Sequence, residues 1–272
     1  MVREEKLDYL IKFLISEEEK YSSIKIPEVR IKKVLLLRSL MNVRAAKEIS
    51  EEFIRIQNEF LCEELKIKGK VILDDIKTVG EEYPKTKLDF ADKVSLWQGD
   101  ITRLEVDAIV NAANNSLLGC FIPMHKCIDN IIHFSSGIQL RDECNELMRK
   151  QDGREETGSA KITKGYNLPA KNIIHTVGPI VYGDLNLENE EDLRKSYKAC
   201  LDIALKNKVR SIAFCCISTG EFSFPNRRAA EIAVETVGDF MKENNSKFDR
   251  IIFNVFKDKD KQIYKELLQY HL

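Results

Sequence analysis

This chain of 272 residues has no long uninterrupted apolar run. In residues 1–15, charged side chains are scattered among apolar ones, unlike the apolar segment of a signal peptide, and no stretch suits a membrane helix. The chain also lacks an excess of one charge, because 43 Lys and Arg face 44 Asp and Glu. These absences argue against a membrane protein and against a basic nucleic-acid-binding surface, and they predict a cytoplasmic location.

Two common nucleotide-binding fingerprints are absent as well. Neither G-x-G-x-x-G nor G-x-x-x-x-G-K-[ST] occurs, which excludes the Rossmann dinucleotide motif and the P-loop. The sequence has no internal repeat and no low-complexity tract. With 43% hydrophobic and 32% charged residues, it nevertheless has enough apolar side chains for a sizeable core.

A disulfide framework is not expected from the cysteines. There are seven of them, an odd number, and without an export signal they favour reduced thiols or metal ligation. Cys215 and Cys216 lie in an apolar stretch, and Cys62, Cys144 and Cys200 lie on predicted helices. We expect these five in the core, as small apolar side chains.

Residues 1 to about 68 are predicted to be helical, because apolar residues recur there at helical spacing. Pro27 suits the first turn of the middle helix. Several apolar stripes in series favour packing on one another or on the next domain, although a stripe can also bind a partner. Residues 69–90, with glycine and proline among charges, are predicted to be a connector. We therefore divide the chain into an N-terminal helical extension with its connector, 1–85, and a second domain, 86–272.

From residue 93 onward, predicted strands alternate with helices. This alternation predicts an α/β sandwich whose sheet is mainly parallel. The predicted strands are 94–98, 108–111, 159–163, 172–177, 211–217 and 250–256, with a further short strand at 71–73 in the connector. The predicted helices are 129–134, 138–150, 190–207, 227–243 and 259–270.

Polar side chains follow the end of the strand at 108–111, where an open α/β sheet binds its ligands. The amide of Asn114 can orient a hydroxyl group through its donor and its acceptor together, and the carboxylate of Asp129 can activate a water molecule or a hydroxyl. Alternatively, Asn114 is a turn residue and Asp129 the N-cap of its helix. His133 shares a helical face with Asp129 and is expected to point inward. His175, inside a strand, is expected to be a core histidine with its hydrogen bonds satisfied.

Cys120, His125 and Cys127 lie between these two polar residues. Thiolate and imidazole are ligands that suit zinc, although C-x4-H-x-C is not a common zinc-finger spacing. A closed structural site has four protein ligands, so three local ligands favour a site with an open position. Alternatively, the cysteines are small buried side chains and His125 lies on the surface.

The segment 217–225, ISTGEFSFP, follows another apolar strand and precedes a helix. Its small residues allow backbone N–H groups to approach an anion, and the helix N-terminus adds a favourable field. Any strand-to-helix turn can use Ser, Thr and Gly, so the segment by itself indicates only a candidate anion site.

Several motifs together resemble the macrodomains of the MacroD type, which bind ADP-ribose. They are GDIT at 99–102, DAIVNAAN at 107–114, LLG at 117–119 and the segment 217–225, and the resemblance extends over about 93–256. In most of that branch a glycine-rich loop follows LLG. Here the loop is replaced by the segment with two cysteines and a histidine, which is similar to the zinc-containing macrodomains of microbes, many of which accompany a sirtuin-type ADP-ribosyltransferase.

The resemblance implies specific roles. Asp100 and the backbone of Ile101 would bind the adenine, and Phe256 would stack on it, worth roughly 1–3 kcal/mol for base–aromatic stacking. The resemblance also places Ile128 and Asp129 against the substrate. The diphosphate and distal ribose would be wrapped by Ser218, Thr219, Gly220, Glu221 and Phe222.

We therefore expect a macrodomain-like α/β/α sandwich with a mixed, mainly parallel sheet and an N-terminal helical extension. Its expected function is zinc-dependent hydrolysis of mono-ADP-ribose from a modified protein, with one Zn²⁺ per chain bound by Cys120, His125 and Cys127. By resemblance, the modified protein could be a lipoyl-carrier protein. The alternatives are a module that binds ADP-ribose without cleaving it and an esterase that acts on O-acetyl-ADP-ribose.

Overall fold

The computed structural model describes residues 1–151, 153–244 and 247–270. Its helices are α1 (Arg3–Ser16), α2 (Arg30–Val43), α3 (Glu51–Lys68), α4 (Val79–Glu82), α5 (Ile128–Ser136), α6 (Gln139–Arg149), α7 (Leu187–Lys206), α8 (Asn226–Asn244) and α9 (Asp258–Tyr270). Its strands are β1 (Val71–Ile72), β2 (Val94–Gln98), β3 (Leu104–Glu105), β4 (Ala108–Ala112), β5 (Ala160–Lys164), β6 (Asn172–Thr176), β7 (Ser211–Phe214) and β8 (Arg250–Val255). Short 3₁₀ helices lie between them: η1 (Glu19–Tyr21), η2 (Leu73–Asp75), η3 (Ala91–Lys93) and η4 (Ile101–Arg103).

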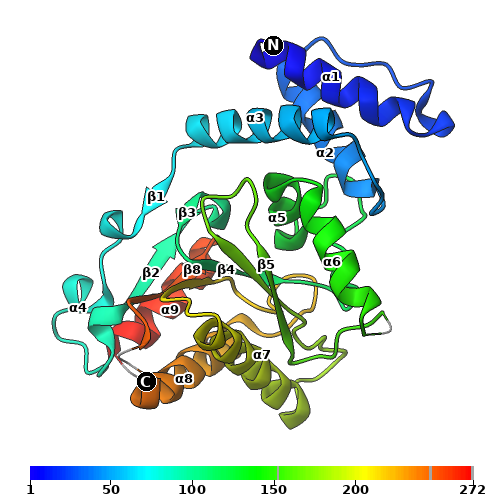
Figure 1. Ribbon diagram of the computed structural model, residues 1–272. Coiled ribbons are helices and arrows are strands. Elements are labelled where there is room, and N and C mark those ends of the chain that lie inside the picture. The colour runs from blue at the N-terminus through cyan, green and yellow to red at the C-terminus, as the bar shows by residue number, and fades with distance from the viewer. Residues whose placement is uncertain (152, 245–246, 271–272) are drawn as a thin grey trace.

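The six main strands form one sheet in the order β2-β8-β7-β4-β6-β5. Every neighbouring pair is parallel except β5 and β6, which are antiparallel. The sheet lies between helices, with α7 and α8 on one side and α5 and α6 on the other (Figure 1). The expected α/β sandwich with a mixed, mainly parallel sheet is confirmed.

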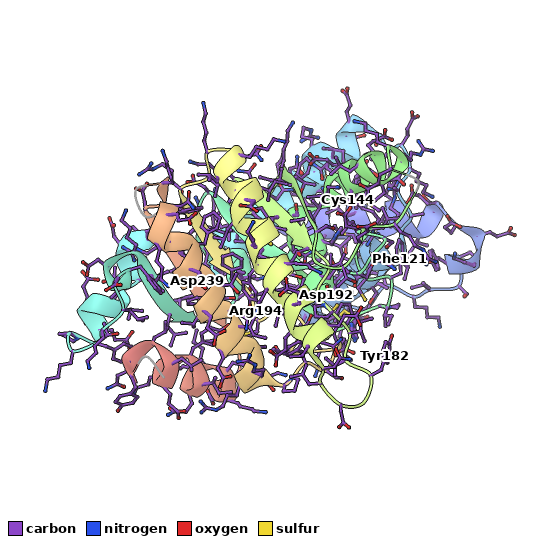
Figure 2. All side chains as sticks on the ribbon, turned by 90° about the horizontal axis from the view of Figure 1, so that it is seen from below. Phe121, Cys144, Tyr182, Asp192, Arg194 and Asp239 are labelled. Atoms are coloured by element: carbon purple, nitrogen blue, oxygen red, sulfur yellow. The ribbon has the colours of Figure 1, made fainter. Side chains whose placement is uncertain are left out.

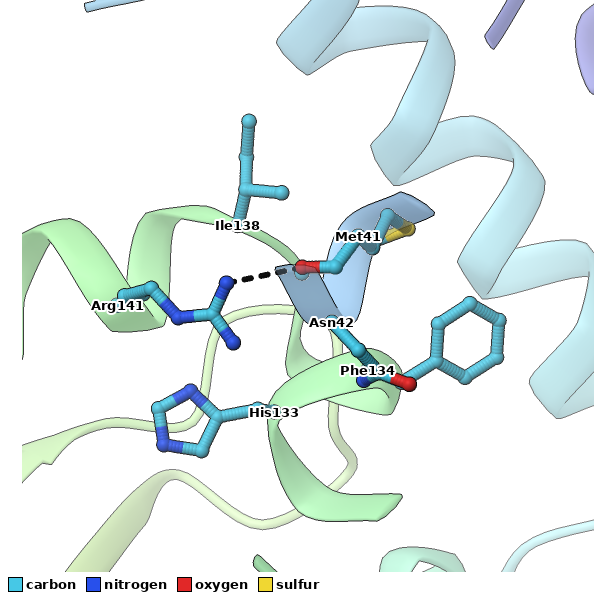
Figure 3. Close-up of a pocket in the computed structure, with 7 residues that line it drawn as sticks. Met41, Asn42, His133, Phe134, Ile138 and Arg141 are labelled. Atoms are coloured by element: carbon cyan, nitrogen blue, oxygen red, sulfur yellow. Dashed lines mark hydrogen bonds between the residues drawn. The ribbon is translucent and has the colours of Figure 1, made fainter. Parts of the chain in front are cut away.

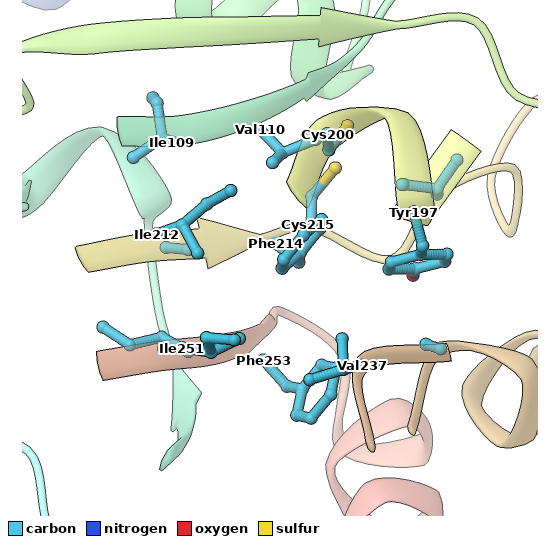
Figure 4. Packing of buried hydrophobic residues seen from close by; sticks show 14 of the residues in the cluster. Ile109, Val110, Tyr197, Cys200, Ile212, Phe214, Cys215, Val237, Ile251 and Phe253 are labelled. Carbon is cyan, nitrogen blue, oxygen red and sulfur yellow. The ribbon is translucent and has the colours of Figure 1, made fainter. Parts of the chain in front are cut away.

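The main core lies between the sheet and its covering helices. Beneath α7, the ring of Tyr197 packs 5.2 Å from that of Phe214 in β7, and Cys200 and Cys215 are buried beside them (Figure 4). The outward side of α7 and α8 is charged instead, with Asp192, Arg194 and Asp239 visible there (Figure 2). This division between apolar and charged faces is typical of helices that cover a sheet.

The N-terminal helices α1, α2 and α3 enclose a second apolar core. Its buried side chains come from all three helices and include Ile138, at the start of α6. The helical prediction for residues 1 to about 68 is therefore confirmed. Helix α2 begins at Arg30, however, so placing Pro27 in its first turn was wrong: residues 24–27 have no regular secondary structure, residues 28–29 form a bend, and the helix starts three residues after Pro27.

Cys62 is exposed, contrary to the expectation that it belongs to the core. It lies on α3, whose buried stripe contains Phe53, Ile56, Phe60 and Leu61. Two residues along a helix rotate the side chain by about 200°, which places Cys62 on the face opposite Phe60 and off that stripe. The other cysteines expected in the core lie inside, with Cys144, Cys200 and Cys215 buried and Cys216 half-buried.

The connector contributes to the main core. Ile76, Val79, Leu88 and Phe90 are all buried there, and β1 pairs with β3 in a small parallel sheet. β7 ends at Phe214, three residues earlier than predicted, because the chain leaves the sheet to form the loop that follows. Among the described residues, no helix combines the length and apolar character required to cross a membrane.

Candidate active site

Four of the sheet's parallel strands deliver candidate residues to one edge. Asp100 follows β2, Asn114 follows β4, the loop at 218–222 follows β7, and Phe256 follows β8. Since the strands are parallel neighbours, their carboxyl ends meet at the same edge of the sheet, where open α/β sheets bind ligands.

A buried hydrogen-bond cluster joins β4 to α5. Nδ2 of Asn111 donates to Oδ1 of Asp129 at 2.8 Å and lies 3.1 Å from Nδ1 of His175. Nδ2 of Asn114 lies 3.4 Å from Oδ2 of the same carboxylate and donates to the carbonyl of Gly119 at 3.1 Å. The structure thus brings Asn114 and Asp129 together, with Asn111 as a third member of the cluster.

Of the two alternative roles predicted from the sequence, the structure confirms that of Asn114 and contradicts that of Asp129. Asn114 is indeed a turn residue, because its Oδ1 accepts the N–H of Ser116 at 3.0 Å. Asp129 is not the N-cap of α5, because that position belongs to Cys127 and the helix already begins at Ile128. Ile128, at this helix start, is half-buried against the main core.

Burial sets the protonation of this cluster. It raises the pKa of Asp129 to about 6, opposed by the hydrogen bond from Asn111 and the charge of Arg141. Burial lowers the pKa of His133 well below its usual value and that of His175 to about 3, so both imidazoles are neutral. His133 points inward as expected, and His175 is a core histidine hydrogen-bonded to Thr163 at 2.9 Å.

Cys120, His125 and Cys127 converge, with their donor atoms all within 4.8 Å of one another. Sγ of Cys120 lies 3.6 Å from Nδ1 of His125. Two such donors on a tetrahedral zinc ion lie about 3.5 Å apart, so this spacing fits one ion. All three residues are half-buried, so the site lies near the surface and not in the core.

The other ring nitrogen of His125 faces the loop that follows β7. Nε2 of His125 lies 3.6 Å from Oε1 of Glu221. A histidine that binds a metal through one nitrogen usually presents the other to a carboxylate or a carbonyl, which orients the ring. Glu221 therefore connects the segment with the three candidate ligands to the candidate diphosphate loop.

The loop at 218–222 has the features of an anion-binding turn. Ser218 has a positive φ of 64°, and its buried Oγ has no hydrogen-bond partner among the residues that the structure describes. A Cβ on Gly178 would meet that Oγ at 2.1 Å, so the close approach of the two segments requires glycine there. Within the described part of the chain, the backbone N–H groups of Gly220, Glu221 and Phe222 have no intramolecular partner, which leaves them available to an anion.

The candidate adenine-binding residues lie at the other end of this edge. Oδ1 of Asp100 caps the short helix η4 by accepting the N–H of Thr102 at 3.0 Å. Its Oδ2 lies 3.6 Å from Nζ of Lys68. The side chain of Ile101 is buried, whereas that of Phe256 is 76% exposed and is not a core residue. An exposed aromatic ring at a strand end can stack on a base.

Sequence reasoning missed four residues in or behind the site. Asn111 carries a detectable signal, since it is a polar side chain within a run of buried strand residues. Asn130, Arg38 and Arg141 carry none, because the contacts of Arg38 with Asn130 and of Arg141 with Met41 join residues 92 and 100 positions apart. Arg141, for example, is buried and donates to the carbonyls of Leu118 at 2.6 Å and of Met41 in α2 at 2.9 Å (Figure 3).

Known proteins resemble this chain over most of its length. A family model described as Macro domain matches residues 110–233. A Protein-ADP-ribose hydrolase of Treponema medium is 46% identical over 98% of this chain and 100% of its own length. The chain belongs to the macrodomain family. The ADP-ribose glycohydrolase MACROD1 of Rattus norvegicus is 48% identical over 70% of each chain, which supports the MacroD-type branch.

A solved macrodomain also supports this fold. The Trypanosoma brucei macrodomain in complex with ADP-ribose has a TM-score of 0.65 and 30% identity, and the match covers 85% of this chain and 94% of that one. The matched region of our macrodomain extends well beyond residues 110–233, so it includes elements that precede the family model.

Proposed function

We propose that this macrodomain hydrolyses mono-ADP-ribose from modified proteins and uses a zinc ion to do so. The chain is an enzyme by homology, because a relative that matches 98% of this chain is named a hydrolase. The observation that carries the mechanism is the placement of three soft donors between Asn114 and Asp129, at the carboxyl edge of the sheet.

Affinity for ADP-ribose would come from the two ends of the site. Asp100 accepts from the adenine amino group, the backbone of Ile101 lies alongside, and the ring of Phe256 stacks on the base. The N–H groups of the loop Ser218, Thr219, Gly220, Glu221 and Phe222 bind the diphosphate and the distal ribose. These roles follow from family resemblance. They agree with the exposure of Phe256 and with the N–H groups of Gly220, Glu221 and Phe222, which have no partner among the described residues.

Asn114 and Asp129 would act at the scissile bond. The amide of Asn114 orients a ribose hydroxyl, and the carboxylate of Asp129 holds or deprotonates the attacking water or a ribose hydroxyl. Asn111 holds Asp129 in place through its 2.8 Å hydrogen bond. Ile128 contributes the apolar surface beside Asp129.

Cys120, His125 and Cys127 fit a zinc site by donor type and by spacing. When bound, zinc with three protein ligands supplies a Lewis acid with one open position. The chain's own contribution is to hold the two thiols and the imidazole beside Asn114, with Glu221 against the imidazole edge of His125.

The biological setting is also a proposal. The zinc-containing microbial macrodomains that the 120–127 segment resembles suggest a lipoyl-carrier protein, modified by a sirtuin-type transferase, as substrate. We place the protein in the cytoplasm and divide it at residues 1–85 and 86–272, as the sequence predicts. A modified protein, rather than nucleic acid or a membrane, is its proposed partner.

The decisive experiment follows release of ADP-ribose from a mono-ADP-ribosylated protein, with and without a chelator. Release that the chelator abolishes supports the proposal. Binding of ADP-ribose without release would favour a reader module. Cleavage of O-acetyl-ADP-ribose but of no modified protein would favour the esterase.

We expect protein purified without added metal to contain about one zinc per chain. Cys127→Ala should lose that zinc, because a ligand set reduced to two cannot retain the ion. Elemental analysis measures this, and Cys62→Ala is the matched control, since Cys62 is an exposed cysteine on α3. Full zinc content in the Cys120→Ala/Cys127→Ala double variant would refute the site.

Asp100→Ala is expected to weaken ADP-ribose binding at least about tenfold, or 1.4 kcal/mol, in calorimetry. Zinc content should not change. Asp100→Asn separates recognition from folding, because its Oδ1 can still accept from Thr102 while its amide group cannot accept from adenine. Unchanged affinity in both variants would remove Asp100 from the binding site.

A further inference from the structure

The segment 120–127, which carries the three candidate ligands, is held by a residue from the N-terminal helices. Arg38 of α2 donates from Nη2 to the carbonyl of His125 at 2.8 Å. The same guanidinium donates to Oδ1 of Asn130 from Nη2 at 2.6 Å and from Nε at 3.0 Å. One side chain therefore contacts both a candidate metal ligand and the helix that carries Asp129.

Asn130 extends this hydrogen-bond network to the other end of the segment. Its side chain is fully buried, and its Nδ2 donates to the carbonyl of Ile122 at 3.0 Å and lies 3.5 Å from that of Cys120. The amide of Asn130 therefore accepts from Arg38 through Oδ1 and donates to the segment through Nδ2. Hydrogen bonds that involve a charged donor are shorter and stronger than neutral ones, which makes Arg38 the anchor of this chain.

Two further contacts tie the same region to α2. Oδ1 of the buried Asn42 accepts the N–H of Met124 at 3.3 Å, at a residue with a positive φ of 60°. Arg141 donates to the carbonyl of Leu118, just before the segment, and to that of Met41 in α2. Figure 3 shows Asn42, Met41 and Arg141 gathered around a cavity of about 10 Å³, which has room for no more than one water molecule.

We propose that α2 is part of the active site and that Arg38 is a positioning residue for the segment 120–127. It fixes the backbone of His125 directly and that of Cys120 and Ile122 through Asn130. Residues before the region matched by the family model, which begins at residue 110, thereby set the geometry of the reaction centre. The inference rests on the proposed function, since the segment is taken to carry the zinc ligands.

The contact requires arginine rather than any positive charge. A planar guanidinium presents several donors in a fixed fork, whereas a lysine ammonium is a single point. Both partners are contacted by Nη2 of Arg38, and a lysine side chain is one atom shorter, so its ammonium stops short of that position and cannot donate to both the carbonyl of His125 and the amide of Asn130. Arg38→Lys is therefore the informative variant, because it keeps the charge and removes the bridge.

The test compares Arg38→Lys with Arg30→Lys in the full chain. Arg30 lies on the same helix and is also half-buried, but it pairs with Glu4 and Glu64 within the N-terminal helices. We measure amide hydrogen exchange of a peptide covering 120–127, zinc retention against a chelator, and single-turnover release of ADP-ribose. For Arg38→Lys we expect at least about tenfold faster exchange, loss of zinc at lower chelator concentration and at least about tenfold slower release. ADP-ribose affinity should change less than about threefold.

Arg30→Lys should leave all of these readouts close to wild type. Asn130→Ala should reproduce the Arg38→Lys effects, and the double variant should add little, because both substitutions break the same bridge. Equal exchange and zinc retention in Arg38→Lys and wild type would overturn the proposal, as would equal losses in Arg30→Lys. Exchange and zinc retention require no turnover, so failure of the proposed hydrolysis is distinguishable from failure of this inference.

Discussion

Asn114→Ala and Asp129→Ala should each slow single-turnover release of ADP-ribose from a modified protein at least tenfold, about 1.4 kcal/mol of barrier. Nδ2 of Asn114 lies 3.4 Å from Oδ2 of Asp129. Asn114 also donates to the carbonyl of Gly119, next to Cys120, and Asp129 lies two residues after Cys127. A group that acts chiefly in the transition state lowers turnover while ground-state binding survives. The affinity for free ADP-ribose should therefore fall far less than the rate.

Asn115→Ala is the matched control for Asn114→Ala. Asn115 is the next residue, is exposed, and contributes only its backbone carbonyl to the hydrogen bond from Glu155. It should release ADP-ribose at the wild-type rate. Asn114→Ala also removes the acceptor for the N–H of Ser116, so its melting temperature must be measured with the rate.

Chelation should have the same pattern as these variants, with slow release and nearly unchanged affinity. Circular dichroism and ADP-ribose titration of the chelated protein check that the segment 120–127 has not unfolded. If the wild-type protein binds ADP-ribose but releases none from any modified substrate, the reader hypothesis becomes the better one. If Asp129→Ala keeps the wild-type rate, Asp129 has no part in the chemistry.

The candidate site could be predicted from sequence because its parts are local. Cys120, His125 and Cys127 lie within eight residues. The end of a buried strand is visible as a change from apolar to polar residues in the sequence. The parallel sheet then places those strand ends at one edge, so the residues that follow the strands lie at the same edge whatever the order of the strands. Alternation of strands and helices is sufficient to predict the sandwich itself.

The supporting contacts could not be predicted in this way. Arg38 and Asn130 are 92 residues apart, and neither stands out from the many charged and polar residues around it. Their pairing depends on how α2 packs on α5, and the hydrophobic periodicity within each segment does not show which helices pack together. The exposed Cys62 shows the same limit at smaller scale, since membership of a helix does not decide the face on which a residue lies.

Removal of the N-terminal helices should destabilise the macrodomain and not merely shorten it. Gln57 of α3 accepts the N–H of Ile138 at 3.0 Å, and Asn58 accepts from Asn167 at 2.8 Å. Without these helices, Ile138 loses its apolar cover and Arg141 loses its carbonyl partner on Met41. Each lost hydrogen bond costs about 0.5–1.5 kcal/mol, or about 1.5–3 kcal/mol where a charged group donates, so with the lost apolar cover the total should reach about 3 kcal/mol or more.

A chain that starts after residue 85 should therefore melt roughly 6–12 °C or more below the full chain. A chain that starts after residue 68 keeps Ile76 and Val79 in the main core, so it should lose less. Ile31→Ala is the control, because this α2 side chain is 67% exposed and its removal should leave the melting temperature unchanged. Since both truncations remove Arg38 and Asn42, both should also lose turnover. A truncated protein with the full-length melting temperature and full activity would instead show that residues 1–68 are an independent module.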